Sequence, residues 1–184
     1  VKVVQEVADR YDPTDLHGTL VCLHVCNVPA YEAQRRDTPI YDQDMNRSFP
    51  GGERSNTTER MANRIYRRFV SQCDLGLDFH TSTRNRTTIY HARADLDDLE
   101  VRRLARAFAT NVVLYGSGDD GSLRSTATVD GIPTVTVEMG RAGAPALSPR
   151  PARRGDARRD RTRDRPRGVR RLPRPRRRVG RRLR

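Results

Sequence analysis

Three short polar segments carry side chains that could do chemistry together. Asp78 and His80 end an apolar segment, and two residues apart on a strand they point to the same face, where the carboxylate can hold the ring of a metal-ligating histidine. Asn46 and Arg47 offer an amide donor and a planar guanidinium that suit a substrate carboxylate. Glu138 ends a Thr-Val alternation, where a carboxylate can take a proton from a metal-activated water. The set predicts a metal-assisted hydrolase acting on a carboxylate-bearing substrate.

Each of these residues alone also has a simpler structural interpretation. His80 is compatible with a partly buried, hydrogen-bonded histidine, and Arg47 with an ion pair to Asp42 or Asp44. Glu138 is compatible with a solvated acid at a strand end. The hypothesis of an active site therefore depends on the three segments meeting in the fold.

The order of expected elements brings them together. Apolar periodicity and capping residues predict helices at 2–11, 57–71 and 95–110, strands at 19–28, 75–81, 112–115 and 134–139, and a long loop at 29–56. Strands alternating with helices predict an α/β domain with a mixed, largely buried sheet. Active sites of such domains collect beyond the carboxyl ends of strands, where both His80 and Glu138 are expected.

The charge of the chain is unevenly distributed. The 184 residues carry a formal net charge of +13, but residues 141–184 alone hold 19 Arg and 3 Asp, which leaves residues 1–140 with a net charge of −3. The Arg/Pro-rich segment 144–184 cannot form a packed core and is expected to be disordered. It is either an out-of-frame reading of GC-rich DNA or a basic arm that binds nucleic acid through phosphates.

The remaining composition favours a soluble, cytoplasmic protein. Three cysteines are too few for a disulfide scaffold. Cys22, His24 and Cys26 alternate on one expected strand face, but no second cluster completes four metal ligands, so we interpret them as core residues. No apolar run approaches the ~18 residues that span a bilayer, and the N-terminal residues do not form a signal peptide.

The three segments, in their order and spacing, resemble the succinylglutamate desuccinylase/aspartoacylase family of zinc carboxypeptidase-like hydrolases. They read Asp-Met-Asn-Arg-Ser-Phe-Pro-Gly at 44–51, Asp-Phe-His-Thr at 78–81 and Thr-Val-Glu-Met-Gly at 136–140. The resemblance extends from Val3 to Gly143 and implies an α/β fold with a mixed, mostly parallel central sheet flanked by helices. We therefore expect residues 1–143 to be a partial zinc-hydrolase domain, followed by the tail at 144–184.

The resemblance also implies catalytic roles. His80 would be the third zinc ligand, and Glu138 would act as general base and then as general acid. Arg36 would polarise the scissile carbonyl, with its neighbour Arg35 as the alternative. Zn²⁺ is the implied cofactor.

For the substrate, the resemblance implies a small N-acyl amino acid or related amide or ester. Asn46 and Arg47 would grip its carboxylate, and Arg124 is a further candidate contact. The family's first two zinc ligands come from a His-x-x-Glu element, and no His-x-x-Glu occurs in this chain. We therefore expect the sequence to start just after that element and its activity to be impaired. The alternative function is a non-catalytic nucleic-acid-binding protein acting through its arginine-rich tail.

Overall fold

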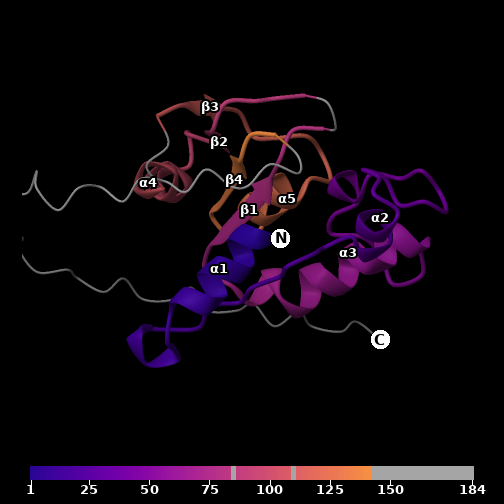
Figure 1. The fold of residues 1–184 in the computed structure, drawn as a ribbon, viewed down its shortest axis with the longest axis horizontal. Coiled ribbons are helices and arrows are strands. Elements are labelled where there is room, and N and C mark those ends of the chain that lie inside the picture. The colour runs from indigo at the N-terminus through magenta and orange to yellow at the C-terminus, as the bar shows by residue number, and fades with distance from the viewer. Residues whose placement is uncertain (84–85, 109–110, 142–184) are drawn as a thin grey trace, which may run out of the picture. The chain divides into compact units, whose positions relative to one another are not determined.

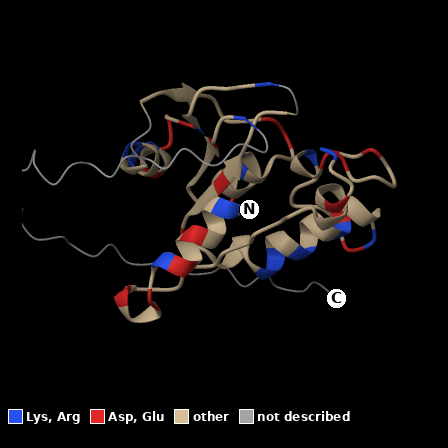
Figure 2. Ribbon diagram, in the orientation of Figure 1, with Lys and Arg blue, Asp and Glu red and all other residues tan. Residues whose placement is uncertain are grey.

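The computed structural model describes residues 1–83, 86–108 and 111–141 (Figure 1). The predicted disordered tail, residues 144–184, lies outside these residues, as do residues 84–85 and 109–110. The tail's proposed binding to nucleic acid stays a prediction for the same reason. In the described residues, basic and acidic residues are interspersed along α1 and in the loops (Figure 2).

A four-stranded sheet forms the centre of the fold. Its strands are β1 (Gly76–His80), β2 (His91–Ala94), β3 (Val113–Tyr115) and β4 (Thr134–Glu138), in the spatial order β1-β4-β2-β3. The β1–β4 and β2–β3 pairs are parallel, and β2–β4 is antiparallel. The prediction of a mixed, mostly parallel sheet flanked by helices is confirmed.

One face of the sheet is apolar because alternate residues of each strand point to it. Helix α4 (Leu99–Ala107) covers this face, and the buried cluster consists of Ala92, Ala94, Val101, Ala105, Val135 and Val137. The intervening residues of β1, β2 and β4 point to the other face. Since they include Asp78, His80, Arg93, Thr136 and Glu138, the second face is polar.

A second core joins the loop before α3 to two helices. Helix α3 (Thr57–Arg68), the short helix η2 (Met45–Arg47) and helix α5 (Leu123–Val129) meet in it, and its buried members are Met45, Phe49, Ala62, Tyr66, Ala127 and Ile132. Helix α3 begins where the sequence predicts, because the Asn56 side chain accepts a hydrogen bond from the amide of Glu59 (3.0 Å). This core fixes η2 against α5.

The remaining elements are small. They are α1 (Lys2–Arg10), η1 (Pro13–Asp15), α2 (Val28–Glu32) and η3 (Val70–Gln72). None of the helices in residues 1–83, 86–108 and 111–141 has the length and apolar character needed to cross a membrane.

The predicted strand at 19–28 is wrong. Residues 19–27 form no strand, α2 begins at Val28, and the side chains of Leu20 and Val21 remain exposed at 47% and 44%. A strand needs a hydrogen-bonded neighbour, and the strands of the described sheet, β1 to β4, pair only with one another. The apolar composition of residues 19–28 was therefore insufficient to predict that they pair with another strand.

One helix prediction needs correction, and one further helix was missed. Helix α4 begins at Leu99 instead of residue 95. The reason is that Asp98 caps its N-terminus, since the Asp98 carboxylate accepts hydrogen bonds from the backbone amides of Glu100 and Val101 (2.8 and 2.9 Å). Helix α5 was not predicted at all. Its Ser- and Thr-rich sequence has modest helix propensity, and packing of Ala127 in the second core stabilises it.

Candidate active site

His80 and Asp78 form a carboxylate–imidazole pair at the carboxyl end of β1. The His80 Nε2 atom lies 2.8 Å from Asp78 Oδ2, which leaves Nδ1 without a partner among the described residues. A metal-ligating histidine commonly has one ring nitrogen held by a carboxylate in this way. Burial alone would lower the pKa of His80, but the hydrogen bond and charge of Asp78, with the charge of Glu138, raise it above its ordinary value.

Glu138 lies at the end of β4, next to His80. The two residues are partners in the parallel β1–β4 register, and the Glu138 side chain is only 14% exposed. Residues directly opposite in a sheet point to the same face, so the carboxylate shares the polar face with the His80 ring. The structure brings the predicted metal ligand and the predicted general base together.

The charge of Arg36, and not that of Arg35, interacts with His80 and Glu138 at these strand ends. The Arg36 guanidinium donates to the Asp44 carboxylate (2.6 Å). This hydrogen bond raises the pKa of Arg36. Burial opposes the shift, and the negative charges of nearby carboxylates, including Glu138, add to it. Arg35 instead pairs with the exposed Asp42. Arg36 is therefore the arginine placed to act on a substrate beside Glu138.

Asn46 is fixed by hydrogen bonds from two sides. The Asp44 carboxylate accepts a hydrogen bond from the backbone amide of Asn46 (2.9 Å). The Asn46 side-chain oxygen accepts one from the backbone amide of Leu123 at the start of α5 (2.8 Å). Because its oxygen is occupied, Asn46 has its amide nitrogen left to donate to a ligand.

Arg47 has protein partners in this structure. Its guanidinium pairs with Asp119 and lies 3.9 Å from Asp44, as the simpler interpretation of this residue anticipates in part. Its side chain is 42% exposed. Arg47 thus lies at the rim of the site. An anionic ligand would have to compete with the Asp119 carboxylate for the Arg47 guanidinium.

Arg124 is buried at the start of α5. The residue is only 8% exposed, and its Nη1 donates to the carbonyl oxygen of Gly116 (2.6 Å). Burial, followed by the positive charge of Arg93, lowers the pKa of Arg124. A Cβ on Gly118 would lie 2.9 Å from Arg124 Nη2, so glycine at 118 leaves room for this guanidinium.

Arg93 and His91 also lie beside Glu138, although their sequence context does not predict site residues. Arg93 Nε lies 3.5 Å from Glu138 Oε1, and His91 is the antiparallel register partner of Glu138. His91 is 3% exposed, with Nδ1 at 2.8 Å from the Ile89 carbonyl oxygen and Nε2 without a partner among the described residues. The available signal was the alternation of His91 and Arg93 with two buried alanines along β2.

The described residues fit one ligand position of a zinc site. His80, oriented by Asp78, has the donor chemistry that zinc requires. In residues 1–83, 86–108 and 111–141, no group of three or more His, Cys, Asp or Glu side chains is placed to hold a metal ion. His80 is therefore the metal-ligand candidate that these residues supply.

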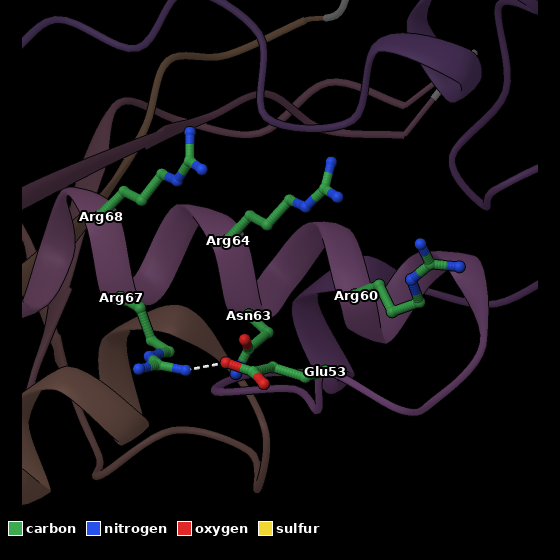
Figure 3. Close-up of a pocket in the computed structure, with 6 residues that line it drawn as sticks. All are labelled: Glu53, Arg60, Asn63, Arg64, Arg67 and Arg68. Carbon is green, nitrogen blue, oxygen red and sulfur yellow. Dashed lines mark hydrogen bonds and ion pairs between the residues drawn. The ribbon is translucent and has the colours of Figure 1, made fainter.

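A cavity of about 490 Å³ lies along α3, away from the strand ends. Arg67 in its wall pairs with Glu53, while Arg64 and Arg68 extend from another side of the helix (Figure 3). The cavity is lined by Glu53, Arg60, Asn63, Arg64, Arg67 and Arg68. It shares no lining residue with the candidate active site.

The fold is that of a hydrolase family. The sequence profile of the succinylglutamate desuccinylase/aspartoacylase catalytic domain matches residues 1–162, so the chain belongs to this family. The prediction of the family from its three segments is confirmed.

Relatives with named activities support the same family. The chain is 33% identical over 106 residues to N-alpha-acetyl-L-2,4-diaminobutyric acid deacetylase of Halomonas elongata, a match that covers 57% of this chain and 31% of the relative. The product-bound ectoine utilization protein EutE of Ruegeria pomeroyi is similar with a TM-score of 0.69 at 27% identity, over 78% of this chain and 46% of that one. A succinylglutamate desuccinylase from Silicibacter sp. gives a TM-score of 0.69 at 26% identity, over the same two shares of 78% and 46%. The chain thus spans less than half the length of these relatives.

Proposed function

We propose that this chain forms part of the active site of a zinc-dependent deacylase that hydrolyses an N-acyl amino acid or a related amide or ester. The observation that carries the proposal is the juxtaposition of the Asp78-oriented His80 with Glu138 at adjacent strand ends. Membership of a deacylase family supports it, as does its similarity to a deacetylase and a desuccinylase.

Each side chain has a defined task in this proposal. Zinc held in part by His80 supplies Lewis-acid activation of water when it is bound. Glu138 accepts the proton of the attacking water and donates it to the leaving amine, which needs a carboxylate within hydrogen-bond reach of both groups. Arg36 stabilises the negative charge that develops on the carbonyl oxygen.

The substrate is held through its carboxylate. Asn46 presents its side-chain nitrogen because its side-chain oxygen accepts the Leu123 amide, while Arg47 on η2 and Arg124 on α5 supply positive charge. A substrate of the N-acyl amino acid class has the carboxylate that such groups recognise. The relative from Halomonas elongata, an N-acetyl-diaminobutyric acid deacetylase by name, suggests a short acyl group.

Zinc affinity tests the metal part of the proposal. We expect competition with a chromophoric chelator to show that His80→Ala weakens zinc binding by at least ~10-fold and that Asp78→Asn weakens it by ~10- to 100-fold, because the carboxylate orients the ring. His17→Ala is the matched control, since His17 is exposed and lies outside the strand ends. Equal zinc affinity of His80→Ala and His17→Ala would contradict the proposal.

The acid–base part is tested separately. Glu138→Gln keeps the size of the side chain but removes its basicity. In a chain extended upstream to carry the family's His-x-x-Glu element, this variant should therefore hydrolyse N-acetyl and N-succinyl amino acids at least ~100-fold more slowly with zinc present. Unchanged turnover in this variant would remove Glu138 from the reaction.

A further inference from the structure

Four arginines follow one another along the exposed side of α3. Arg60, Arg64 and Arg68 are four residues apart, so successive members are ~6 Å apart along the helix axis and turned by ~40° around it. Arg67 belongs to the same stripe, one residue before Arg68. The other side of α3 is buried in the second core, so the arginines point away from that core.

These arginines line the cavity of about 490 Å³ along α3 (Figure 3). The lining residues carry four positive charges against the one negative charge of Glu53, which gives a net charge of +3. Arg67 pairs with Glu53, and Figure 3 shows this pair on one side of the helix, with Arg64 and Arg68 extending from another. Small-molecule sites commonly have volumes of ~300–1,000 Å³, so the cavity is large enough for a small ligand.

The loop that carries Glu53 is held closely against α3. Asn63 Nδ2 lies 3.3 Å from the carbonyl oxygen of Gly51 and 3.4 Å from that of Pro50. Gly51 has a φ of +74°, and a Cβ built on it would lie 2.1 Å from the carbonyl oxygen of Glu59, so only glycine permits this approach. The fold therefore fixes this wall of the cavity without a ligand.

Three of the four guanidiniums have no partner among the described residues. The side chains of Arg60, Arg64 and Arg68 are exposed, and within the part of the chain that the structure describes they make no hydrogen bond or ion pair. The carboxylate of Glu59, next to Arg60 in the sequence, instead accepts the hydroxyl of Ser55. The donors of the three guanidiniums are therefore available to an anion.

The spacing of these arginines does not stabilise the helix. Cations in the last turn of a helix interact favourably with its dipole, which accounts for Arg67 and Arg68. Arg60 and Arg64 lie before that turn. Because like charges four residues apart repel one another on a helix, Arg64 interacts unfavourably with both Arg60 and Arg68. An anion that carries several charges would relieve both repulsions at once.

A short chain of phosphates has the chemistry that this cavity fits. Guanidinium groups bind phosphate oxygens through paired N–H donors. Linked phosphoryl groups place several negative charges close together, as the three neighbouring guanidiniums require. Sites for single-stranded nucleic acid combine phosphate contacts with aromatic side chains on which bases stack, and none of the residues that line the cavity is aromatic. The cavity therefore favours a small phosphate ligand over a nucleic acid.

We propose that the cavity along α3 binds an oligophosphate, either inorganic or the phosphate chain of a nucleotide, through Arg60, Arg64 and Arg68. The cavity shares no lining residue with the candidate active site. The proposal therefore goes beyond the proposed hydrolase function and does not depend on it.

Protection of individual arginines from modification by phenylglyoxal tests this site. The full chain is modified in metal-free buffer at fixed ionic strength, with inorganic triphosphate in excess. Mass spectrometry of peptides gives the rate at each arginine, which distinguishes binding at α3 from binding at the 19 arginines of residues 141–184. Triphosphate should slow modification of Arg60, Arg64 and Arg68 together by at least ~5-fold, along one saturable curve. Arg10, which is exposed at the end of α1, should change by less than ~2-fold.

Arg64→Gln removes the central guanidinium of the stripe. The triphosphate concentration that half-protects Arg60 and Arg68 should then rise at least ~10-fold, because charge-assisted hydrogen bonds are lost. Arg64→Lys should give an intermediate value, since lysine retains the charge but not the planar fork. Arg10→Gln is the matched control, because it makes the same change in net charge at an exposed arginine outside the cavity. Circular dichroism verifies that each variant folds, and Arg64→Lys retains the charge if Arg64→Gln does not.

Equal half-protection in Arg64→Gln and Arg10→Gln would overturn the proposal, as would the absence of protection on α3 in the unchanged chain. Protection by orthophosphate at the same concentration as triphosphate would also overturn it, because the site would then not require linked phosphates. A single-stranded RNA that protects α3 at a lower phosphate concentration than triphosphate would overturn it in favour of nucleic acid. Adenosine triphosphate distinguishes the two sources of an oligophosphate. Stronger protection than by triphosphate supports a nucleotide, and equal or weaker protection supports the phosphate chain alone.

Discussion

Replacing Gly121 with alanine tests how closely the loop before α5 packs on η2. Gly121 has a φ of +70°, and a Cβ built on it would lie 2.5 Å from the carbonyl oxygen of Arg47 and 2.7 Å from its carbonyl carbon. A left-handed conformation costs a non-glycine residue ~1–2 kcal/mol. Relieving a clash with backbone atoms adds ~1–3 kcal/mol, so Gly121→Ala should lower the free energy of unfolding by ~2–5 kcal/mol in total.

Gly131→Ala separates the two contributions. Gly131 has a φ of +81°, but nothing lies within 4 Å of its built Cβ, so this variant should lose only the conformational ~1–2 kcal/mol. Urea unfolding followed by circular dichroism at 222 nm measures both free energies. If the two variants differ by less than ~0.5 kcal/mol, the packing of Gly121 on Arg47 contributes nothing, and the reasoning about the site's framework is wrong.

Two further predictions concern other parts of this framework. Burial alone would raise the pKa of Asp44, but the hydrogen bond from Arg36, with other donors, lowers it. The ionised Asp44 carboxylate therefore stabilises the folded protein above the unfolded-state pKa, and this stabilisation is lost as the pH falls through the folded-state pKa. Asp44→Asn should lower the free energy of unfolding by about 1 kcal/mol at pH 7 and by much less at pH 3. Urea unfolding measures this loss at both pH values, and an equal loss at pH 7 and pH 3 would contradict the prediction. Tyr66→Phe removes the donor of a buried hydroxyl that bonds Asp130 and should cost ~1–3 kcal/mol by thermal unfolding, while a loss below ~0.5 kcal/mol would show that this bond is not formed.

The sheet and the strand-end site were predictable because their signals are local. Alternation of Thr and Val along residues 134–138 correctly indicates one apolar and one polar face, and the two-residue spacing of Asp78 and His80 correctly places them on one face. The Asn56 side chain likewise identifies the start of α3. In each case a few consecutive residues determine the conformation.

The features that were missed depend on partners distant in sequence. The apolar residues 19–28 read as a strand, but a strand forms only where a neighbour is available. Helix α5 depends on the Asn46 side chain and on packing of Ala127, neither of which its own sequence reveals. Arg93 looked like an ordinary strand arginine until the register of β2 against β4 placed it beside Glu138.

The contacts between η2 and α5 determine when the site can appear during folding. The hydrogen bonds from Leu123 to Asn46 and from Thr126 to Phe49 each join residues 77 positions apart. Closing a loop of that length costs roughly 4 kcal/mol of chain entropy before these contacts compensate for it. Partly folded chains therefore acquire α3 and α4, whose contacts are local, before they acquire an ordered Asn46. The amide of Leu123 becomes a natural reporter of this late step, since its hydrogen–deuterium exchange slows only once the two halves of the site have met.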